Sequence, residues 1–264
     1  MSGAGPAALR RFLLPGAVFA VAVVTFLPAL GAEFVNWDDY DNVLNNRNVH
    51  GLGPTQLRWM WTGTVIGHWI PLTWMSFGLN YALGGLNPRG YHLLNLLLHA
   101  ASATVFFFIA RRLLRAARAA AAEPGLSVGA GFAALLFAVH PLRVESVVWV
   151  TERKDVLCGL FFMLAIIAYL RAVEGTTLRR RWMYASLAAS AAALLSKAAA
   201  MPLPAVILLL DVYPLRRAHT IGWRRCLLEK LPWAAVAAVG AGVALRVVLM
   251  STGVTGYETY GLGS

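Results

Sequence analysis

Charged residues are scarce in this chain. Of its 264 residues, 13% are charged and 59% are hydrophobic, whereas an ordinary soluble domain has about 25% charged residues. This composition argues against a water-soluble globule, a disordered chain and a solenoid with a polar surface. Cysteine is also rare: Cys158 lies in an apolar run and Cys226 lies among arginines. We therefore predict no disulfide framework and no cysteine metal site.

Acidic residues are scarcer than basic ones. The chain has 12 Asp and Glu residues against 23 Lys and Arg residues, which gives a formal net charge of +11. In a soluble protein this charge would indicate nucleic-acid binding. In a chain this apolar it indicates a membrane protein whose cytoplasmic loops are rich in arginine. We therefore expect a lipid bilayer, and no nucleic acid, as the partner.

Long apolar runs are abundant. Because a membrane helix needs about 20 apolar residues, runs that end at charged clusters predict a single membrane domain over residues 1–264: an all-α, polytopic bundle of about seven spans. The predicted spans are residues 11–31, 91–111, 126–142, 156–173, 182–197, 199–214 and 231–250. The first could also be a cleaved signal peptide, although its apolar run is long for one.

The fifth and sixth predicted spans are short, and Pro202 and Pro204 lie at their junction. They could instead form one re-entrant hairpin. With a cytoplasmic N-terminus, seven crossings place most arginines inside, whereas a hairpin would leave the arginines of residues 216–225 outside. The positive-inside rule therefore favours seven crossings with the N-terminus in the cytoplasm.

Residues 32–90 form the one long segment outside the predicted spans. Within it, residues 55–61 and 71–83 mix aromatic, aliphatic and polar side chains. This mixture predicts short amphipathic helices that lie on the outer leaflet. A large first outer loop of this kind can form a lid over a cavity in the membrane.

Three aspartates, Asp38, Asp39 and Asp41, follow the first predicted span. Carboxylates this close together could bind a divalent cation, or one of them could have its pKa raised into the range of a general base. The simpler alternative is a solvated acidic loop. Trp37 and Tyr40, which alternate with the carboxylates, favour an enclosed site. No other cofactor is indicated, and a metal requirement stays open.

The second predicted span carries His92, Asn95 and His99 on one helical face. Polar groups inside a membrane are costly and face a partner or a cavity. We predict that these three residues, together with His140 in the next outer loop, line a cavity. Hydrogen bonds between helices are the alternative.

Several basic residues lie on the predicted outer side, where the positive-inside rule disfavours them. They are Arg143, Arg153, Lys154 and Lys197. A phosphate-bearing ligand would explain their presence, because arginine forks bind phosphate well. Pairing with Glu145, Glu152 and Asp155, or with lipid headgroups, is the alternative.

Taken in order, six short motifs resemble one family. They are Trp37-Asp38-Asp39-Tyr40-Asp41-Asn42, His68-Trp69-Ile70-Pro71-Leu72-Thr73-Trp74, Gly90-Tyr91-His92-Leu93-Leu94-Asn95, His140-Pro141, Arg153-Lys154-Asp155 and Leu195-Ser196-Lys197. This series is similar to the membrane region of the transmembrane and tetratricopeptide-repeat O-mannosyltransferases and their bacterial relatives, in the GT-C class of polytopic glycosyltransferases. The resemblance extends over about residues 10–215.

The resemblance implies a membrane enzyme that moves a sugar from a polyprenyl-phosphate donor to a hydroxyl group of a protein or another acceptor on the outer face. It implies that the catalytic residues are Asp38 and Asp39, one of them a general base in an inverting displacement. The residues expected around the lipid phosphate are Arg143, Glu145, Arg153, Lys154, Asp155 and Lys197.

No tetratricopeptide repeats occur in the chain, so we expect it to correspond to the N-terminal membrane part of a longer relative or to a reduced homologue. A non-catalytic membrane scaffold and a small-solute transporter are the alternative functions. High alanine and arginine usage suggests a bacterial inner membrane, with the first large loop in the periplasm.

Overall fold

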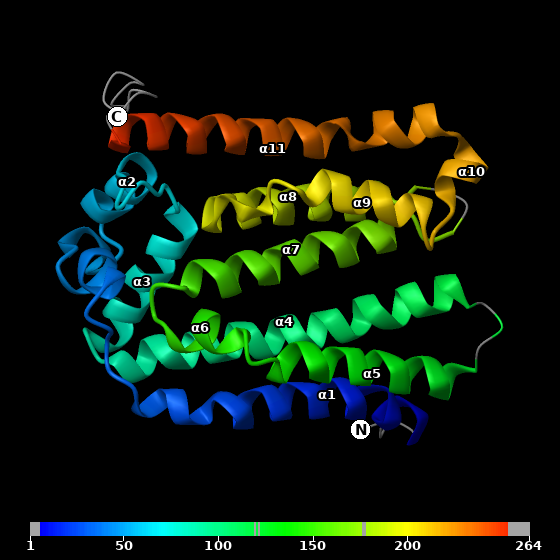
Figure 1. Cartoon of the computed structure of the whole chain (residues 1–264), viewed down its shortest axis with the longest axis horizontal. Coiled ribbons are helices and arrows are strands. Elements are labelled where there is room, and N and C mark those ends of the chain that lie inside the picture. The colour runs from blue at the N-terminus through cyan, green and yellow to red at the C-terminus, as the bar shows by residue number, and fades with distance from the viewer. Residues whose placement is uncertain (1–5, 119, 121, 176–177, 253–264) are drawn as a thin grey trace, which may run out of the picture.

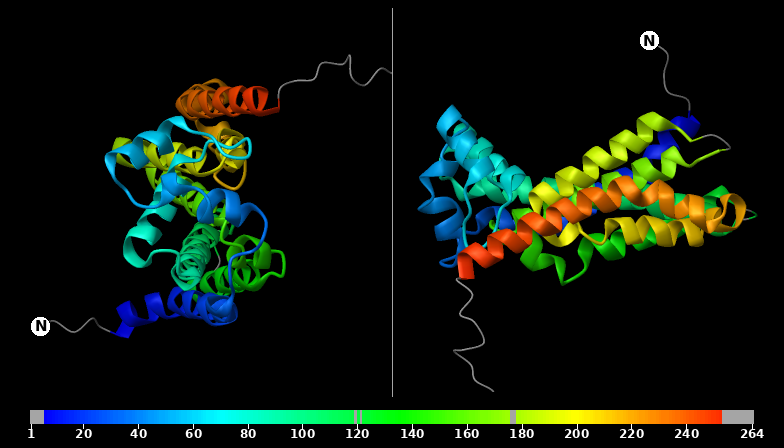
Figure 2. Two further views of the ribbon diagram at one scale, coloured as in Figure 1. Left: turned by 90° about the vertical axis from the view of Figure 1, so that its left-hand side faces the viewer. Right: turned by 90° about the horizontal axis from the view of Figure 1, so that it is seen from above.

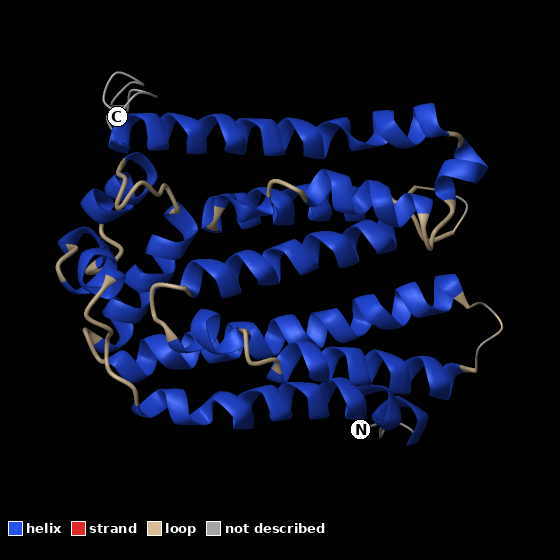
Figure 3. Cartoon of the chain, in the orientation of Figure 1, coloured by secondary structure: helices blue, strands red, loops and turns tan. Residues whose placement is uncertain are grey.

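The computed structural model describes residues 6–252 except 119, 121, 176 and 177. Within these residues every regular element is a helix, apart from one isolated bridge between Val65 and His68 (Figure 3). The predicted all-α class is thereby confirmed.

Long helices lie side by side and make up most of the structure (Figure 1). They are α1 (Pro6–Phe26), α4 (Pro88–Ala117), α5 (Glu123–Val139), α7 (Arg153–Ala172), α8 (Arg180–Ser196), α9 (Leu203–Val212) and α11 (Trp223–Thr252). The shorter elements are the 3-10 helices η1 (Leu27–Gly31), η3 (Arg47–Val49) and η4 (Ala198–Ala200), the π-helix η2 (Tyr40–Leu44), and the helices α2 (Pro54–Thr62), α3 (Pro71–Gly84), α6 (Arg143–Val148) and α10 (Arg217–Ile221).

The bundle has two distinct ends, at the left and right of Figure 1. We call the left end the loop end; it contains residues 32–87, the turn 140–152 and the junction 197–202. We call the right end the arginine end; it contains the α4–α5 turn, the α7–α8 turn and helix α10. Figure 2 shows the same division from above, with α2 and α3 gathered at one end of the long helices.

Four helical segments are long and apolar enough to cross a membrane: Phe12–Gly31, Pro88–Ala117, Arg153–Ala172 and Trp223–Met250. Two shorter apolar helical segments, Glu123–Val139 and Ala198–Val212, also lie within the bundle. Each of the seven predicted spans overlaps a helix or helical segment, but the number of crossings stays a prediction. Helices α2 and α3 occupy the two stretches of the first loop for which we expected helices; their location on a membrane surface is likewise a prediction.

Proline sets the start of several helices at the loop end. Pro54, Pro71 and Pro88 begin α2, α3 and α4, where the missing N–H has no intrahelical partner to lose. At α4 the Asn87 side chain also accepts a hydrogen bond from the Arg89 N–H. Helix α3 ends and α4 begins on either side of the short turn at residues 85–87, and both helices contact α7.

Small residues allow close packing on one side of the bundle. Helices α1, α4 and α5 meet in a buried cluster composed mainly of alanines, as membrane helices commonly do where their backbones approach closely. The alanines are Ala22, Ala100, Ala103, Ala130, Ala134 and Ala138. Helix α7 lies in the interior of the bundle, and its Ile166 and Tyr169 join Ile207 of α9 and Trp233 of α11 in a second cluster. The edge helices α1 and α11 are the least buried of the four candidate spans.

Candidate functional site at the loop end

Asp39 is fully buried and anchors the first loop. Its Oδ1 accepts hydrogen bonds from the backbone N–H and the hydroxyl group of Thr151, at 2.8 and 2.6 Å. Its Oδ2 accepts from the Val35 N–H at 2.9 Å. Asp39 therefore joins the acidic loop to the turn that precedes α7, and its oxygens are already occupied.

Asp38 differs from its neighbour. It is half-buried, and only its backbone oxygen accepts a hydrogen bond, from the Asn42 side chain. Among the described residues no hydrogen bond or ion pair engages the Asp38 carboxylate. Its charge acts on His68, which places the two side chains in the same electrostatic environment.

His68 is presented by a tight turn. Val65 and His68 form the bridge that closes the turn, and the two residues between them, Ile66 and Gly67, have φ of 47° and 69°. Positive φ at both central positions is the pattern of a type I′ hairpin turn. For a β-branched residue such as Ile66 this conformation costs about 1–2 kcal/mol, and strain of this kind is concentrated at functional sites.

Two lysines and two carboxylates gather beside His68, where α7 begins and α8 ends. Lys154 Nζ lies 2.8 Å from Glu152 Oε1. Lys197 Nζ lies 3.5 Å from Glu152 Oε2 and also pairs with Asp155. Lys154 is buried, whereas Lys197 and Asp155 are partly open to solvent. We call Asp38, His68, Glu152, Lys154, Asp155 and Lys197 the loop-end cluster.

Burial and neighbouring charges shift the pKa of two of these groups. Partial withdrawal from water lowers the pKa of His68, and the positive charges of Lys154 and Lys197 lower it further. Burial alone would raise the pKa of Glu152, but its hydrogen bond with Asp155 and the nearby lysines bring it below the usual value. The cluster thus combines an imidazole and a Glu152 carboxyl group whose pKa values are both lowered with the side chains of two lysines.

An apolar groove leads away from the cluster along the membrane helices. Its volume is about 420 Å³. His68 and Lys197 line one part together with Trp69 and Ile70 of the first loop. Most of the remainder is formed by aliphatic residues of α8 and α11, including Leu194, Val239 and Val243. The groove is therefore apolar along most of its length and has the side chains of Lys197 and His68 at its mouth.

A second cavity, of about 390 Å³, lies on the other side of the Lys197–Asp155 pair. Its lining includes His99, Arg143 and Asp155. The Arg143 guanidinium lies 4.6 Å from the centre of the Phe137 ring. His99 lies in the lining of this cavity, and its Nε2 hydrogen-bonds to the Ala138 carbonyl. Arg143 faces this cavity and is absent from the lining of the apolar groove.

Arg153 does not join the cluster. It is fully buried, donates to the Asn95 and Asn80 side chains and to the Tyr91 carbonyl, and lies over the Phe77 ring. No carboxylate pairs with it among the described residues. Arg153 therefore ties α3 and α4 to α7, and Asn95, which also donates to the Trp149 carbonyl, is a structural partner with no place in the lining of either cavity.

Three other predicted site residues lie apart from the cluster. Glu145 is exposed and lines a shallow pocket with Trp37 and Trp149. His140 is exposed, and its Nδ1 accepts from the Leu142 N–H, so it caps a turn and lines neither cavity. His92 is buried within α4 and likewise lines neither cavity.

The sequence left open whether the aspartates bind a divalent cation. Among the described residues, no group of three or more His, Cys, Asp and Glu side chains is arranged to hold a metal ion. Asp38 and Asp39 have different environments, because Asp39 turns inward to Thr151. The metal requirement is therefore as open as it was from the sequence.

The sequence reasoning did not single out His68 or Thr151 as functional neighbours. It named Glu152 only as an alternative ion-pair partner of the basic residues, and the structure pairs Glu152 with Lys154 and Lys197. His68 had a signal: between residues 59 and 88 it is the one side chain that is acidic, basic or an imidazole. Thr151 had none, because its bond to Asp39 joins positions 112 apart in sequence.

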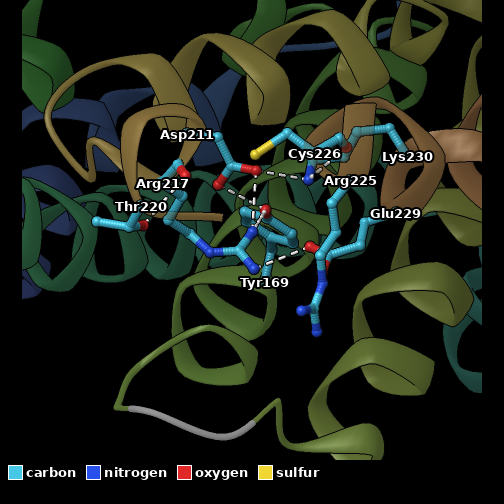
Figure 4. A network of polar contacts seen from close by, with 8 residues as sticks. All are labelled: Tyr169, Asp211, Arg217, Thr220, Arg225, Cys226, Glu229 and Lys230. Carbon is cyan, nitrogen blue, oxygen red and sulfur yellow. Dashed lines mark hydrogen bonds and ion pairs between the residues drawn. The ribbon is translucent and has the colours of Figure 1, made fainter. Parts of the chain in front are cut away.

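A second polar network was also missed, at the arginine end (Figure 4). Asp211 is fully buried and accepts from Lys230, Arg217 and the Tyr169 hydroxyl, at 2.6, 3.0 and 2.6 Å. Arg217 also contacts Glu229 at 2.8 Å. Because charges of both signs are paired, we interpret this network as a structural tie between α7, α9, α10 and α11.

These features define an all-helical membrane protein with a polar cluster at one end of its bundle and an apolar groove that opens beside it. Comparison with known proteins gives the family. Protein O-mannosyl-transferase TMTC4 of Homo sapiens is 32% identical over 197 residues, which are 68% of this chain and 26% of that protein. TMTC2 of Homo sapiens is 31% identical over 215 residues, 75% of this chain and 24% of that protein. Tmtc2 of Drosophila melanogaster is 35% identical over 207 residues, 73% of this chain and 21% of that protein.

The chain therefore belongs with the TMTC protein O-mannosyl-transferases in one family, as its motifs indicated. It spans about a quarter of the length of these relatives. No family model matches the chain, and no solved structure matches it significantly.

Proposed function

We propose that this chain forms the catalytic membrane region of a glycosyltransferase of the GT-C type. It moves a sugar, mannose by analogy with the names of its relatives, from a polyprenyl-phosphate donor to a hydroxyl group of a protein acceptor. The reaction takes place at the loop end, which we propose faces the periplasm or an equivalent outer compartment, with the N-terminus in the cytoplasm.

One observation carries the proposal: the apolar groove between α8 and α11 opens at Lys197 and His68. A polyprenyl-phosphate has the same division, with a long apolar chain and one anionic head. The aliphatic walls favour the chain by removing its surface from water and lipid headgroups. The Lys197 ammonium group has three N–H donors. Two of them can serve the ion pairs with Glu152 and Asp155, so the third is available for a phosphate oxygen.

We assign the general base to Asp38. Its carboxylate is half-buried and not engaged by another described residue, whereas the Asp39 oxygens hold Thr151 and Val35. Asp38 takes the proton of the acceptor hydroxyl group as the acceptor oxygen bonds to the anomeric carbon. The bond from that carbon to the phosphate oxygen breaks at the same time, and its electron pair leaves with the phosphate. A single displacement of this kind inverts the anomeric centre.

Negative charge develops on the departing phosphate, so cationic groups beside it lower the barrier. Lys197 and Lys154 fill this role in the proposal, and His68 supplies a hydrogen bond at the mouth of the groove. Because a phosphate is already a weak base, no general acid is required. Arg153 is a positioning residue, because its guanidinium group donates hydrogen bonds to Asn95, Asn80 and the Tyr91 carbonyl.

The test is sugar transfer by the full chain in membranes supplied with radiolabelled polyprenyl-phosphate mannose. We expect Asp38→Asn to lower the rate by about 10²-fold or more, as loss of a general base does. Asp41→Asn, which changes an exposed acid in the same loop, is the matched control and keeps the wild-type rate.

Equal rates for the wild type and Asp38→Asn would refute the assignment of the base. If the wild-type chain is folded and transfers no sugar, the chain is a non-catalytic scaffold, and the proposed function is wrong.

A further inference from the structure

A separate cavity at the arginine end is lined by four arginines and two phenylalanines. Its volume is about 360 Å³, and its lining residues are Phe12, Phe108, Arg111, Arg112, Arg115 and Arg171. They come from α1, α4 and α7. This cavity lies at the opposite end of the bundle from the loop-end cluster, so the proposed transferase reaction does not use it.

The arginines are only partly neutralised. Glu123 uses both carboxylate oxygens on Arg111 and Arg115, at 2.6 and 2.5 Å. Glu174 lies 3.9 Å from Arg112, which is too long for a good hydrogen bond. The side chains of both acids are more than half exposed, so solvent screening weakens their electrostatic attraction to the arginines.

Two guanidinium groups are left with capacity to bind an anion. Arg171 stacks on Trp182, with its guanidinium carbon 4.6 Å from the ring centre, and has no ion pair within the described part of the chain. The Nε atoms of Arg111 and Arg112 are buried and lack a hydrogen-bond partner there. Arg171, Arg115 and Arg111 all repel Arg112 electrostatically. An anion between Arg112 and Arg171 would relieve this repulsion.

The chemistry of the walls identifies the anion as part of a lipid. The arginines end the apolar stretches of α4 and α7, at the depth where phospholipid headgroups lie. Phe12 is 64% exposed at the beginning of the first candidate span and offers an apolar surface for the glycerol and acyl region. Basic pockets of this kind between membrane helices suit anionic headgroups.

We propose that this arginine-end cavity binds the headgroup of an anionic phospholipid, with a phosphate held between Arg112 and Arg171. Arginine binds phosphate bidentately through its planar fork. Four guanidinium groups against two carboxylates leave an excess of two positive charges, so a lipid with two phosphates is favoured over a lipid with one.

The experiment compares thermal unfolding of the delipidated full chain in neutral detergent with cardiolipin, phosphatidylcholine or sodium pyrophosphate added. For the wild type we expect cardiolipin at about a hundredfold over its Kd to raise Tm by about 5 °C or more. Phosphatidylcholine, which has no net charge, produces no shift. An equal shift with pyrophosphate would identify a free phosphate as the ligand and overturn the lipid proposal.

The double variant R112Q/R171Q loses most of the cardiolipin shift. The matched control, R224Q/R225Q, removes the same charge from two exposed arginines at the same end and keeps the shift. Equal shifts in all three proteins would mean that general charge attracts the lipid, and the site would be refuted.

If R112Q/R171Q does not fold, the variant R112K/R171K keeps the charge and removes the planar fork. A reduced cardiolipin shift supports the bidentate site, and a full wild-type shift overturns it. Native mass spectrometry of the same samples counts the bound lipids: we expect one cardiolipin retained by the wild type and by R224Q/R225Q, and its loss from R112Q/R171Q.

Discussion

At the scale of single residues, two adjacent aspartates have opposite environments. Asp39 is buried and occupied, whereas Asp38 is half-buried and its carboxylate is not engaged among the described residues. A carboxylate that accepts several hydrogen bonds contributes to stability, because its removal leaves buried donors unsatisfied. The two positions should therefore respond differently to the same change from aspartate to asparagine.

We expect Asp39→Asn to destabilise the fold by about 2 kcal/mol. The amide has one acceptor oxygen, so it cannot serve both Thr151 and Val35, and its NH₂ group faces donors. In detergent the unfolding midpoint should fall by about 4–8 °C, whereas Asp38→Asn should unfold near the wild-type temperature. Thr151→Val, which removes the 2.6 Å hydroxyl bond and keeps the backbone bond, should lower the midpoint by a smaller amount. An Asp39→Asn variant as stable as the wild type would contradict the anchoring role.

The contrast between Asp38 and Asp39 could not be predicted from the sequence. Sequence reasoning identified the acidic loop, the basic residues of the outer side and the polar face of the second predicted span as polar features, without ranking their members. It could not predict that Arg153 is structural while its neighbour Lys154 belongs to the loop-end cluster. Adjacent positions on a helix face different ways, and the role of Arg153 depends on its hydrogen bonds to Asn80 and Asn95 in other elements. Contacts between distant segments decide which polar side chain is structural and which stays open to a ligand.

At the scale of elements, hydropathy predicted where the helices lie but not where they end. The apolar run at residues 91–111 belongs to α4, which extends over Pro88–Ala117. Its start is set by Pro88 and the Asn87 cap, and its last turns contain arginines whose long side chains can reach the membrane surface. The groove between α8 and α11 was not predictable, since it depends on how these two helices pack.

A bulky side chain in this groove should impair use of a long-chain donor. We expect Val243→Trp, on the groove wall, to lower kcat/KM for a polyprenyl-phosphate sugar by about tenfold or more, since each lost CH₂ contact is worth about 0.8 kcal/mol. A donor analogue with a short chain should be affected less. Leu245→Trp, on the exposed side of the same helix, is the control and should behave as the wild type. A loss that is equal for both variants, or independent of chain length, would refute the groove as the lipid site.

At the scale of the whole molecule, charge divides the bundle into two ends with different roles. The arginine end carries an excess of positive charge and the buried Asp211 network, whereas the loop end combines carboxylates and lysines in near balance. The net charge of +11 agrees with the orientation that we propose, in which the arginine end lies in the cytoplasm. The balanced set contains the proposed base and the proposed phosphate contacts.

The sequence allows α8 and α9 to form either two crossings or one re-entrant hairpin. The structure offers a geometric reason to favour two crossings. Helix α8 begins at the arginine end, and the carbonyl of Ser196, its last residue, accepts from the Thr73 hydroxyl group of α3 at the loop end. Helix α9 then leads back to α10 at the arginine end (Figure 1). A segment that reaches the loop end and returns should place residues 118 and 224 on the same side of the membrane.

Cysteine labelling in intact cells tests this topology. The native Cys158 and Cys226 are buried, so background labelling should be low. Asn45→Cys, at an exposed position of the first loop, should react with an impermeant maleimide. Arg118→Cys and Arg224→Cys, exposed at the arginine end, should react only after the membrane is permeabilised, because the positive-inside rule places them in the cytoplasm. Labelling at 224 but not at 118 in intact cells would indicate a re-entrant hairpin, and labelling at 118 and 224 but not at 45 would reverse the orientation.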